Sequence, residues 1–276
     1  MNYRHIYHAG NVCDVVKHVT LLALLAHLKQ KTAPFAAIDT HAGCGLYDLD
    51  SEAARKTAEA DDGVSALLRS PAAPEFMDYR AALGKANPGI YPGSPHLILH
   101  ALRPGDRYIG CELHPEDYAE LRNNLGRSPQ AQLHQRDGYE ALAALVPPQE
   151  KRGLALIDPP YEQPDEYARV VAAVAAAYRR WPAGIYAIWY PIKDRPALWQ
   201  FHEAMASTGI GRQLLLEFIY RDETRADRLN GSGMIVINPP WQFDAAMRAT
   251  YAKLHETLAT EAKTTKISWL TPESNA

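Results

Sequence analysis

Short apolar runs alternate with longer segments of helical periodicity along most of this 276-residue chain. The runs at 34–39, 106–112 and 153–158 are brief, as β-strands are, whereas 12–30 and 165–181 repeat apolar residues at three- and four-residue spacing. Strands that alternate with helices are typical of an open, mostly parallel sheet with helices packed against it. We therefore predict an α/β fold.

Acidic residues end four of the predicted strands, at Asp39, Glu112, Asp137 and Asp158. Open parallel sheets bind their ligands at the carboxyl ends of the strands, which meet at one edge. A single acid in such a place is often only a turn former. Four of them together favour a ligand that is rich in hydroxyl and amine donors.

A glycine-containing loop, "DTHAGCG" at 39–45, follows the first of these strands. Gly43 and Gly45 allow tight turning and close approach of a ligand to the backbone. The loop lacks the Gly-x-Gly-x-x-Gly spacing of dinucleotide sites and no clear helix start follows it, so it does not indicate phosphate binding. It suits a ligand without phosphate, such as S-adenosylmethionine. His41 could contact that ligand or merely cap the turn, and the sequence leaves both interpretations open.

The order of the strands suggests what two further positions do. Glu112 is placed to accept both hydroxyls of a ribose, because the two oxygens of one carboxylate are spaced for a vicinal diol. Asp137 and Gly138 are placed to meet an adenine amine and its ring, with the glycine leaving room for the base. Both assignments depend on strand order and not on the residues alone.

The stretch "LIDPPYE" at 156–162 carries the sharpest chemical signal. Two prolines stiffen the backbone and fix where the Asp158 carboxylate and the Pro159 carbonyl point. Two such acceptors can hold the hydrogens of an exocyclic amine on a base, while Tyr161 stacks on the ring. We predict Asp158, Pro159 and Tyr161 as the catalytic group; the alternative is a Pro-Pro turn that only ends a strand.

A second stretch, "VINPPWQ" at 236–242, repeats this pattern with Asn238 in place of the acid. Only 35 residues follow Trp241, which is too few for the strands and helices that would have to come after a fourth strand. We therefore predict that this Pro-Pro pair is structural.

The interval between the first two predicted strands is longer than the fold requires. From Gly45 to Glu112 is 67 positions, whereas the ribose acid of dinucleotide folds follows the glycine loop by about 20. The surplus contains helix-like segments followed by "YPGSP". We predict one domain formed by 1–46 and 94–276, with an inserted helical subdomain at 47–93.

Composition limits the environment and the partners. The chain is 47% hydrophobic and 22% charged, and no apolar stretch is long enough to span a membrane. Neither the amino terminus nor the three scattered cysteines indicate secretion, so we expect a cytoplasmic protein. The histidines and cysteines lack the spacing of metal ligands, so we expect no metal site. A net charge of −3 means that any nucleic-acid contact needs a local basic face.

Seven motifs together resemble the bacterial RlmJ family of 23S ribosomal RNA methyltransferases, which act on adenine N6. They are "YRHIYHAGNVCDVVKH" (3–18), "DTHAGCG" (39–45), "YPGSP" (91–95), "ELHP" (112–115), "RDG" (136–138), "LIDPPYE" (156–162) and "SGMIVINPPW" (232–241). They cover almost the whole length in order. Asp-Pro-Pro-Tyr alone would indicate only an amino-methyltransferase, whereas the amino-terminal segment and the unusual glycine loop are far more specific.

The resemblance implies a class I, Rossmann-like fold that depends on S-adenosylmethionine. It implies cofactor contacts at His18, His41, Ser94, Glu112, Asp137, Gly138 and Asp158. Asp158 would accept the adenine amine, and Lys17, in the amino-terminal segment, is a weaker candidate for the site. Tyr3 would meet the RNA, with Arg4 and His5 in the same RNA-facing arm. The partner would be naked or partly assembled 23S ribosomal RNA, bound by a monomer; RNA contacts of the insertion cannot be carried over.

Two alternative functions remain open at this point. The same chemistry could act on adenine N6 in DNA, although no segment resembles a target-recognition domain for a duplex. The chain could also be a non-catalytic RNA-binding assembly factor on a methyltransferase-like scaffold, although the acids and the tyrosine are all present.

Overall fold

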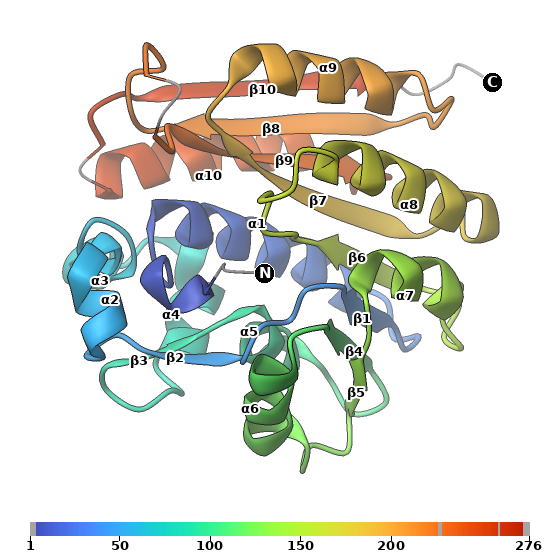
Figure 1. The fold of residues 1–276 in the computed structure, drawn as a ribbon, viewed down its shortest axis with the longest axis horizontal. Helices are drawn as coiled ribbons and strands as arrows, with labels where there is room; N and C mark the ends of the chain where they lie inside the picture. The colour runs from blue at the N-terminus through green and yellow to red at the C-terminus, as the bar shows by residue number, and fades with distance from the viewer. Residues whose placement is uncertain (1–3, 226–227, 259, 273–276) are drawn as a thin grey trace.

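A computed structural model describes residues 4–225, 228–258 and 260–272. In this part of the chain eight strands form one sheet in the order β10-β8-β9-β7-β6-β1-β4-β5 (Figure 1). Their bounds are β1 Ala36–Asp39, β4 Arg107–Glu112, β5 Ala131–Gln135, β6 Gly153–Ile157, β7 Ile185–Ile192, β8 Gln213–Ile219, β9 Gly231–Ile237 and β10 Thr264–Thr271.

Five neighbouring strands, β5, β4, β1, β6 and β7, run parallel. Strand β9 is inserted antiparallel between β7 and β8, and β10 pairs antiparallel with the outer side of β8. The loop at 220–230 that joins β8 to β9 is too short for the crossover that a parallel pair needs, so these strands form a hairpin. The prediction of a mostly parallel sheet is confirmed.

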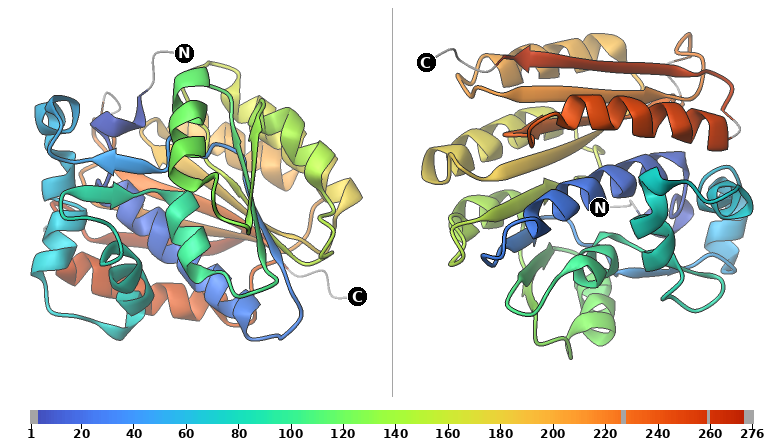
Figure 2. Two further views of the ribbon diagram at one scale, coloured as in Figure 1. Left: turned by 90° about the horizontal axis from the view of Figure 1, so that it is seen from below. Right: turned by 180° about the vertical axis from the view of Figure 1, so that it is seen from behind.

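Helices cover both faces of the sheet (Figures 1 and 2). One face packs on α1 Val12–Lys29, α5 Ser94–Ala101, α6 Pro115–Leu125 and α10 Phe243–Thr257. The other packs on α7 Gly138–Leu145, α8 Glu166–Arg180 and α9 Arg195–Ala206. Successive side chains of a strand point to opposite faces, so Leu156 enters the first core and Ile157 the second. Each side of the strands is therefore apolar, and the polar groups concentrate where the strands end.

Residues 47–93, predicted as an inserted subdomain, leave and rejoin the main fold through a two-stranded ribbon. Strands β2 (Leu46–Asp48) and β3 (Ile90–Pro92) pair antiparallel. Between them lie α2 Glu52–Thr57, α3 Val64–Arg69 and α4 Met77–Leu83, with 3-10 turns at Glu59–Asp61 and Pro74–Phe76. The buried side chains of this segment, among them Leu67 and Tyr79, belong to the same core as α1. We propose that the insertion packs as part of the domain and does not fold separately.

The two Pro-Pro stretches lie at opposite edges of the sheet. Asp158 follows the carboxyl end of β6, whereas β9 runs the other way and pairs Ile237 with Tyr186 near the start of β7. Asn238 adopts a positive φ of 55° and donates from Nδ2 to the carbonyls of Pro182 and Gly184, both at 2.8 Å. The Asn238 side chain therefore ties the turn before β7 to the end of β9, as a structural residue does. No helix in the described ranges is long and apolar enough to cross a membrane.

Candidate active site

A cavity of about 1080 Å³ opens at the carboxyl edge of the parallel strands. Its walls include every predicted site residue that the structure describes: Arg4, His5, His18, His41, Ser94, Glu112, Asp137, Gly138, Asp158, Pro159 and Tyr161. Tyr3 lies outside the described residues. Side chains that are up to 157 positions apart in the sequence thus meet in one site, because parallel strands all end at the same edge.

The Glu112 carboxylate is held against the glycine loop by the backbone. Gly43 N donates to Oε2 at 2.8 Å and His114 N donates to Oε1 at 2.7 Å. Each oxygen keeps a lone pair for a further donor. Burial raises the pKa of Glu112, and the backbone donors oppose that rise. A carboxylate fixed in this way, with both oxygens available, suits the vicinal hydroxyls of a ribose.

Asp137 and Gly138 form the start of α7. Asp137 Oδ1 caps the helix by accepting from the amides of Tyr139 and Glu140, at 2.8 and 3.2 Å, and Oδ2 pairs with Arg169 at 2.9 Å. A Cβ at position 138 would lie 2.1 Å from the Thr40 carbonyl oxygen. The structure thus gives a further reason for Gly138, beside the predicted one of room for a base, which stays a prediction. The glycine is required because the loop after β1 touches α7 there.

Three predicted residues line the wall between this loop and α1. Ser94 Oγ donates to the buried Asp39 at 2.7 Å, and burial raises the pKa of Asp39 to about 7. Burial lowers the pKa of His18 to about 3, so its ring is neutral, and Nδ1 lies 2.7 Å from the hydroxyl of Tyr91. Burial also lowers the pKa of His41 to about 4. These side chains are neutral polar groups that can bind an uncharged or cationic ligand.

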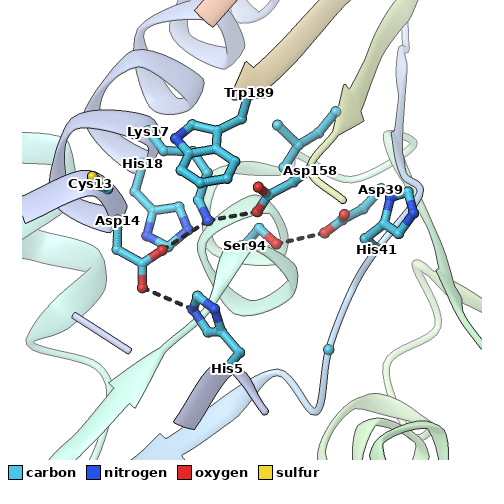
Figure 3. A network of polar contacts seen from close by, with 12 residues as sticks. His5, Cys13, Asp14, Lys17, His18, Asp39, His41, Ser94, Asp158 and Trp189 are labelled. Carbon is cyan, nitrogen blue, oxygen red and sulfur yellow. Dashed lines mark hydrogen bonds and ion pairs between the residues drawn. The ribbon is translucent and has the colours of Figure 1, made fainter. Parts of the chain in front are cut away.

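An ion-pair network crosses the cavity beside Asp158 (Figure 3). Lys17 Nζ lies 2.6 Å from Asp158 Oδ2 and 2.8 Å from Asp14 Oδ1. His5 Nε2 lies 2.9 Å from Asp14 Oδ2, which also accepts from Gly10 N at 2.9 Å. Burial opposes the ammonium, but the two carboxylates outweigh it and raise the pKa of Lys17. Lys17 is therefore charged, and it fixes one oxygen of Asp158.

Tyr161 is locked in place next to this network. Its φ is 53°, in the left-handed region, and its hydroxyl donates to the Trp189 carbonyl at 2.6 Å. Its ring centroid lies 4.8 Å from that of Tyr167 and 6.0 Å from that of Trp189. A rigid aromatic ring beside a carboxylate acceptor is the arrangement that a flat amine-bearing base requires.

Sequence reasoning missed two residues of the site. Asp14, which the sequence did not single out, holds both Lys17 and His5. Trp189 projects from the carboxyl end of β7, with Lys17 Nζ 5.6 Å from its ring. The spacing Asp14–Lys17 on one helix face was an available signal for the first. For Trp189, the only signal in the sequence was its place near the end of a strand.

The amino-terminal arm closes over one side of the cavity. Arg4 pairs with Glu116 in the first turn of α6, at 2.6 Å, where both side chains are largely exposed. The His5 ring packs edge-on against Tyr47, with the centroids 4.9 Å apart. The predicted RNA-facing residues Arg4 and His5 therefore lie at the rim of the cavity that contains Asp158.

The donor set fits S-adenosylmethionine. Glu112 suits its ribose, neutral side chains surround the loop after β1, and carboxylates balance a sulfonium and an ammonium group. Across the described ranges, no three His, Cys, Asp or Glu side chains cluster in a way that would hold a metal ion.

Comparisons with known proteins agree with this geometry. The family model for ribosomal RNA large subunit methyltransferase D, RlmJ, matches residues 32–271. The chain is 38% identical to ribosomal RNA large subunit methyltransferase J of Haemophilus influenzae, over 99% of this chain and 100% of that protein. It is 37% identical to the Escherichia coli protein of the same name, with the same coverage. A crystal structure of a Legionella pneumophila protein superposes with a TM-score of 0.88 at 32% identity, over 95% of this chain and 98% of that one. The chain therefore belongs to the RlmJ family of ribosomal RNA large subunit methyltransferases.

Proposed function

We propose that this chain transfers a methyl group from S-adenosylmethionine to the N6 amine of one adenine in 23S ribosomal RNA. The observation that carries the proposal is Asp158, a carboxylate that projects into the cavity beside the fixed ring of Tyr161. Both curated relatives are named as large-subunit ribosomal RNA methyltransferases. Asp158 thus supports an amine as the acceptor, Tyr161 supports a base, and the names of the relatives support RNA as the substrate.

Asp158 and Pro159 act on the amine. An exocyclic amine is a poor nucleophile because its lone pair is delocalised into the ring. Asp158 Oδ2 is held by Lys17, so Oδ1 and the Pro159 carbonyl accept the two amine hydrogens and favour the pyramidal form. The cofactor, when bound, supplies the methyl group as an electrophile. The ionised carboxylate is also the group best placed to receive the proton that the amine releases.

Tyr161 and Trp189 orient the base. An adenine that stacks on Tyr161 gains about 1–3 kcal/mol. The hydrogen bond from Tyr161 to the Trp189 carbonyl fixes the ring before the base arrives, so less ordering is needed on binding. Enzymes that modify a base extrude it from its stack, and loops and bulges of RNA offer bases that are already accessible. We propose such a loop as the substrate.

The remaining residues divide between cofactor and RNA. We assign His18, His41, Ser94, Glu112, Asp137 and Gly138, with Asp158, to S-adenosylmethionine. We assign Tyr3, Arg4 and His5 to the RNA, because the two that are described lie at the cavity rim. We further propose that the enzyme acts in the cytoplasm as a monomer on naked or partly assembled 23S RNA.

A methyl-transfer assay with radiolabelled S-adenosylmethionine and unmodified 23S RNA tests the proposal. Wild-type protein should label the RNA, Asp158→Ala should not, and Asn238→Ala should label it if folded. No labelling by wild type, or normal labelling by Asp158→Ala, would overturn it. Preference for a DNA oligonucleotide of equal sequence would indicate the DNA alternative. Calorimetry that showed RNA binding without S-adenosylmethionine binding would indicate a non-catalytic assembly factor.

A further inference from the structure

The two halves of the cavity, on either side of Asp158, differ in the charge of the side chains that line them. Acidic side chains line the half above β1, β4 and β5, where the cofactor residues lie: Glu112, Asp117, Glu120 and Asp137. The half above β7, β8 and β9 contributes the cations Lys193, Arg221 and Arg228 and the acid Asp194. A polyanion that approaches Asp158 from this second half meets more cations than acids, whereas the first half presents four carboxylates.

Arg221 and Arg228 in this half point at a common position. Arg221 Nε lies 3.9 Å from Glu261 Oε1, and Arg228 Nη2 lies 3.3 Å from Glu261 Oε2. About a third of each arginine side chain is exposed, and 59% of the Glu261 side chain is. Surface pairs of this kind contribute little to stability, about 0–1 kcal/mol, so another anion can displace the carboxylate at low cost.

Each guanidinium group makes a second contact that restricts its position. The Arg221 guanidinium lies over the Tyr220 ring, 5.2 Å from its centroid. Arg228 Nε donates to Asn230 Oδ1 at 3.2 Å. Because these contacts already restrict the arginine side chains, less conformational entropy is lost when a ligand binds.

Asn230 connects this pair to the catalytic edge of the sheet. Its backbone amide donates to the Ile192 carbonyl at the end of β7, at 2.8 Å, and its carbonyl accepts from the amides of Tyr220 and Arg221, at 3.0 and 3.1 Å. Strand β7 also carries Trp189, whose carbonyl holds Tyr161. The backbone around the two arginines is therefore held in a fixed position relative to Tyr161, on which the base is proposed to stack.

We propose that Arg221 and Arg228 form a clamp for a backbone phosphate of the RNA beside the target nucleotide, and that Glu261 occupies the phosphate position in the free protein. Two guanidinium groups around one small oxyanion match the geometry in which arginine binds phosphate. The clamp rests on the proposed function, because it takes RNA as the substrate of this cavity.

Salt-dependent binding of unmodified 23S RNA tests the clamp. The variant Arg221→Gln/Arg228→Gln is compared with Arg127→Gln/Arg179→Gln, which removes the same charge at two exposed arginines that do not line the cavity. The clamp variant should bind RNA about tenfold more weakly or worse, and the slope of log affinity against log salt should fall by about 1, because one phosphate contact is lost. Calorimetry should give the wild-type affinity for S-adenosylmethionine, which also shows that the variant is folded.

A third variant, Glu261→Gln, tests the role of the carboxylate. It should bind RNA as tightly as wild type or severalfold more tightly, since it removes the competing anion. Equal affinity and slope in the clamp and control variants, or weaker binding by Glu261→Gln, would overturn the clamp. Wild-type methyl transfer would then still stand and leave the proposed function intact. Absence of wild-type transfer would instead count against the function, whatever the binding slopes.

Discussion

Lys17 holds the carboxylate that faces the substrate through an ion pair. Its ammonium lies between Asp14 and Asp158, and all three side chains are largely buried in the cavity wall. Two buried carboxylates without that cation would repel each other, and protonation of one of them would relieve the repulsion. The position of a lysine on a helix thus affects an acceptor 141 positions away.

Lys17→Met should therefore impair both stability and transfer. Removing one partner of a buried ion pair costs about 3–5 kcal/mol, which urea unfolding will measure. Methyl transfer at pH 7 should fall, because Asp158 loses the ammonium that fixes its Oδ2. The exposed Lys31→Met serves as control. A folded Lys17→Met protein with wild-type transfer at pH 7 would show that Asp158 does not need this cation.

His18 should make the protein sensitive to acid. Burial lowers the pKa of His18 to about 3, whereas an unfolded histidine titrates near 6.5. The unfolded state therefore binds the proton first, so this stability is present above pH 6.5 and is lost as pH falls towards 3. Between pH 7 and pH 5 the loss is about 2 kcal/mol. In urea unfolding, His18→Gln should lose about that much less over the same interval, whereas the exposed His100→Gln should behave as wild type.

Site residues were predictable from the sequence where their place in the strand order determines their position. Asp39, Glu112, Asp137 and Asp158 follow strand ends, and strand ends are visible in the apolar pattern. The directions of side chains on α1 were not predictable in the same way. Asp14 and Trp189 became part of the site because α1 packs against β7 and β9, with Cys13 on the start of β9 at Gly231 and Lys17 near Trp189. A local pattern does not encode this packing.

A contact between two elements explains why residue 138, beside the proposed cofactor residues, is a glycine. Helix α7 begins against the loop after β1, and Gly138 allows the Thr40 carbonyl to approach. Gly138→Ala should push that loop away from α7 and change the wall near His41. We expect a loss of about 1–3 kcal/mol in the free energy of unfolding, and weaker binding of S-adenosylmethionine by calorimetry. Gly84→Ala, whose added Cβ meets only ordinary contacts near 3.5 Å, is the matched control; equal effects in both would contradict the explanation.

Strand and helix positions were largely predictable, but directions were not. Alternation of apolar runs and helical periodicity located β1, β4, β6, α1 and α8 to within a few residues. The antiparallel entry of β9 depends on a hairpin between two late strands, and its register is a long-range property. That direction is what separates Asn238 from Asp158, so the sequence alone could exclude the "NPPW" stretch only by counting the residues that follow it.

At the level of the whole molecule, the insertion is connected to the site through the amino-terminal arm. Glu59 of the insertion accepts from Asn11 at 2.9 Å and lies 3.0 Å from His8 Nδ1. Val64 N donates to the Gly10 carbonyl at 2.8 Å. These contacts position the turn that leads into α1, and hence Asp14 and Lys17. The helix-rich composition of 47–93 indicated a subdomain but not this contact, because the two segments lie about fifty positions apart.

Glu59→Ala should therefore loosen the arm without disturbing the cofactor half of the cavity. His8 and Asn11 would lose a shared acceptor, and the arm that carries Arg4 and His5 would sample positions away from the rim. We expect KM for 23S RNA to rise severalfold, while the affinity for S-adenosylmethionine in calorimetry stays unchanged. Glu52→Ala, an exposed acid in the same insertion that does not line the cavity, should leave both quantities at the wild-type values. If Glu59→Ala instead weakened cofactor binding and left KM for RNA unchanged, the insertion would act on the cofactor half of the cavity, and the arm would not depend on it.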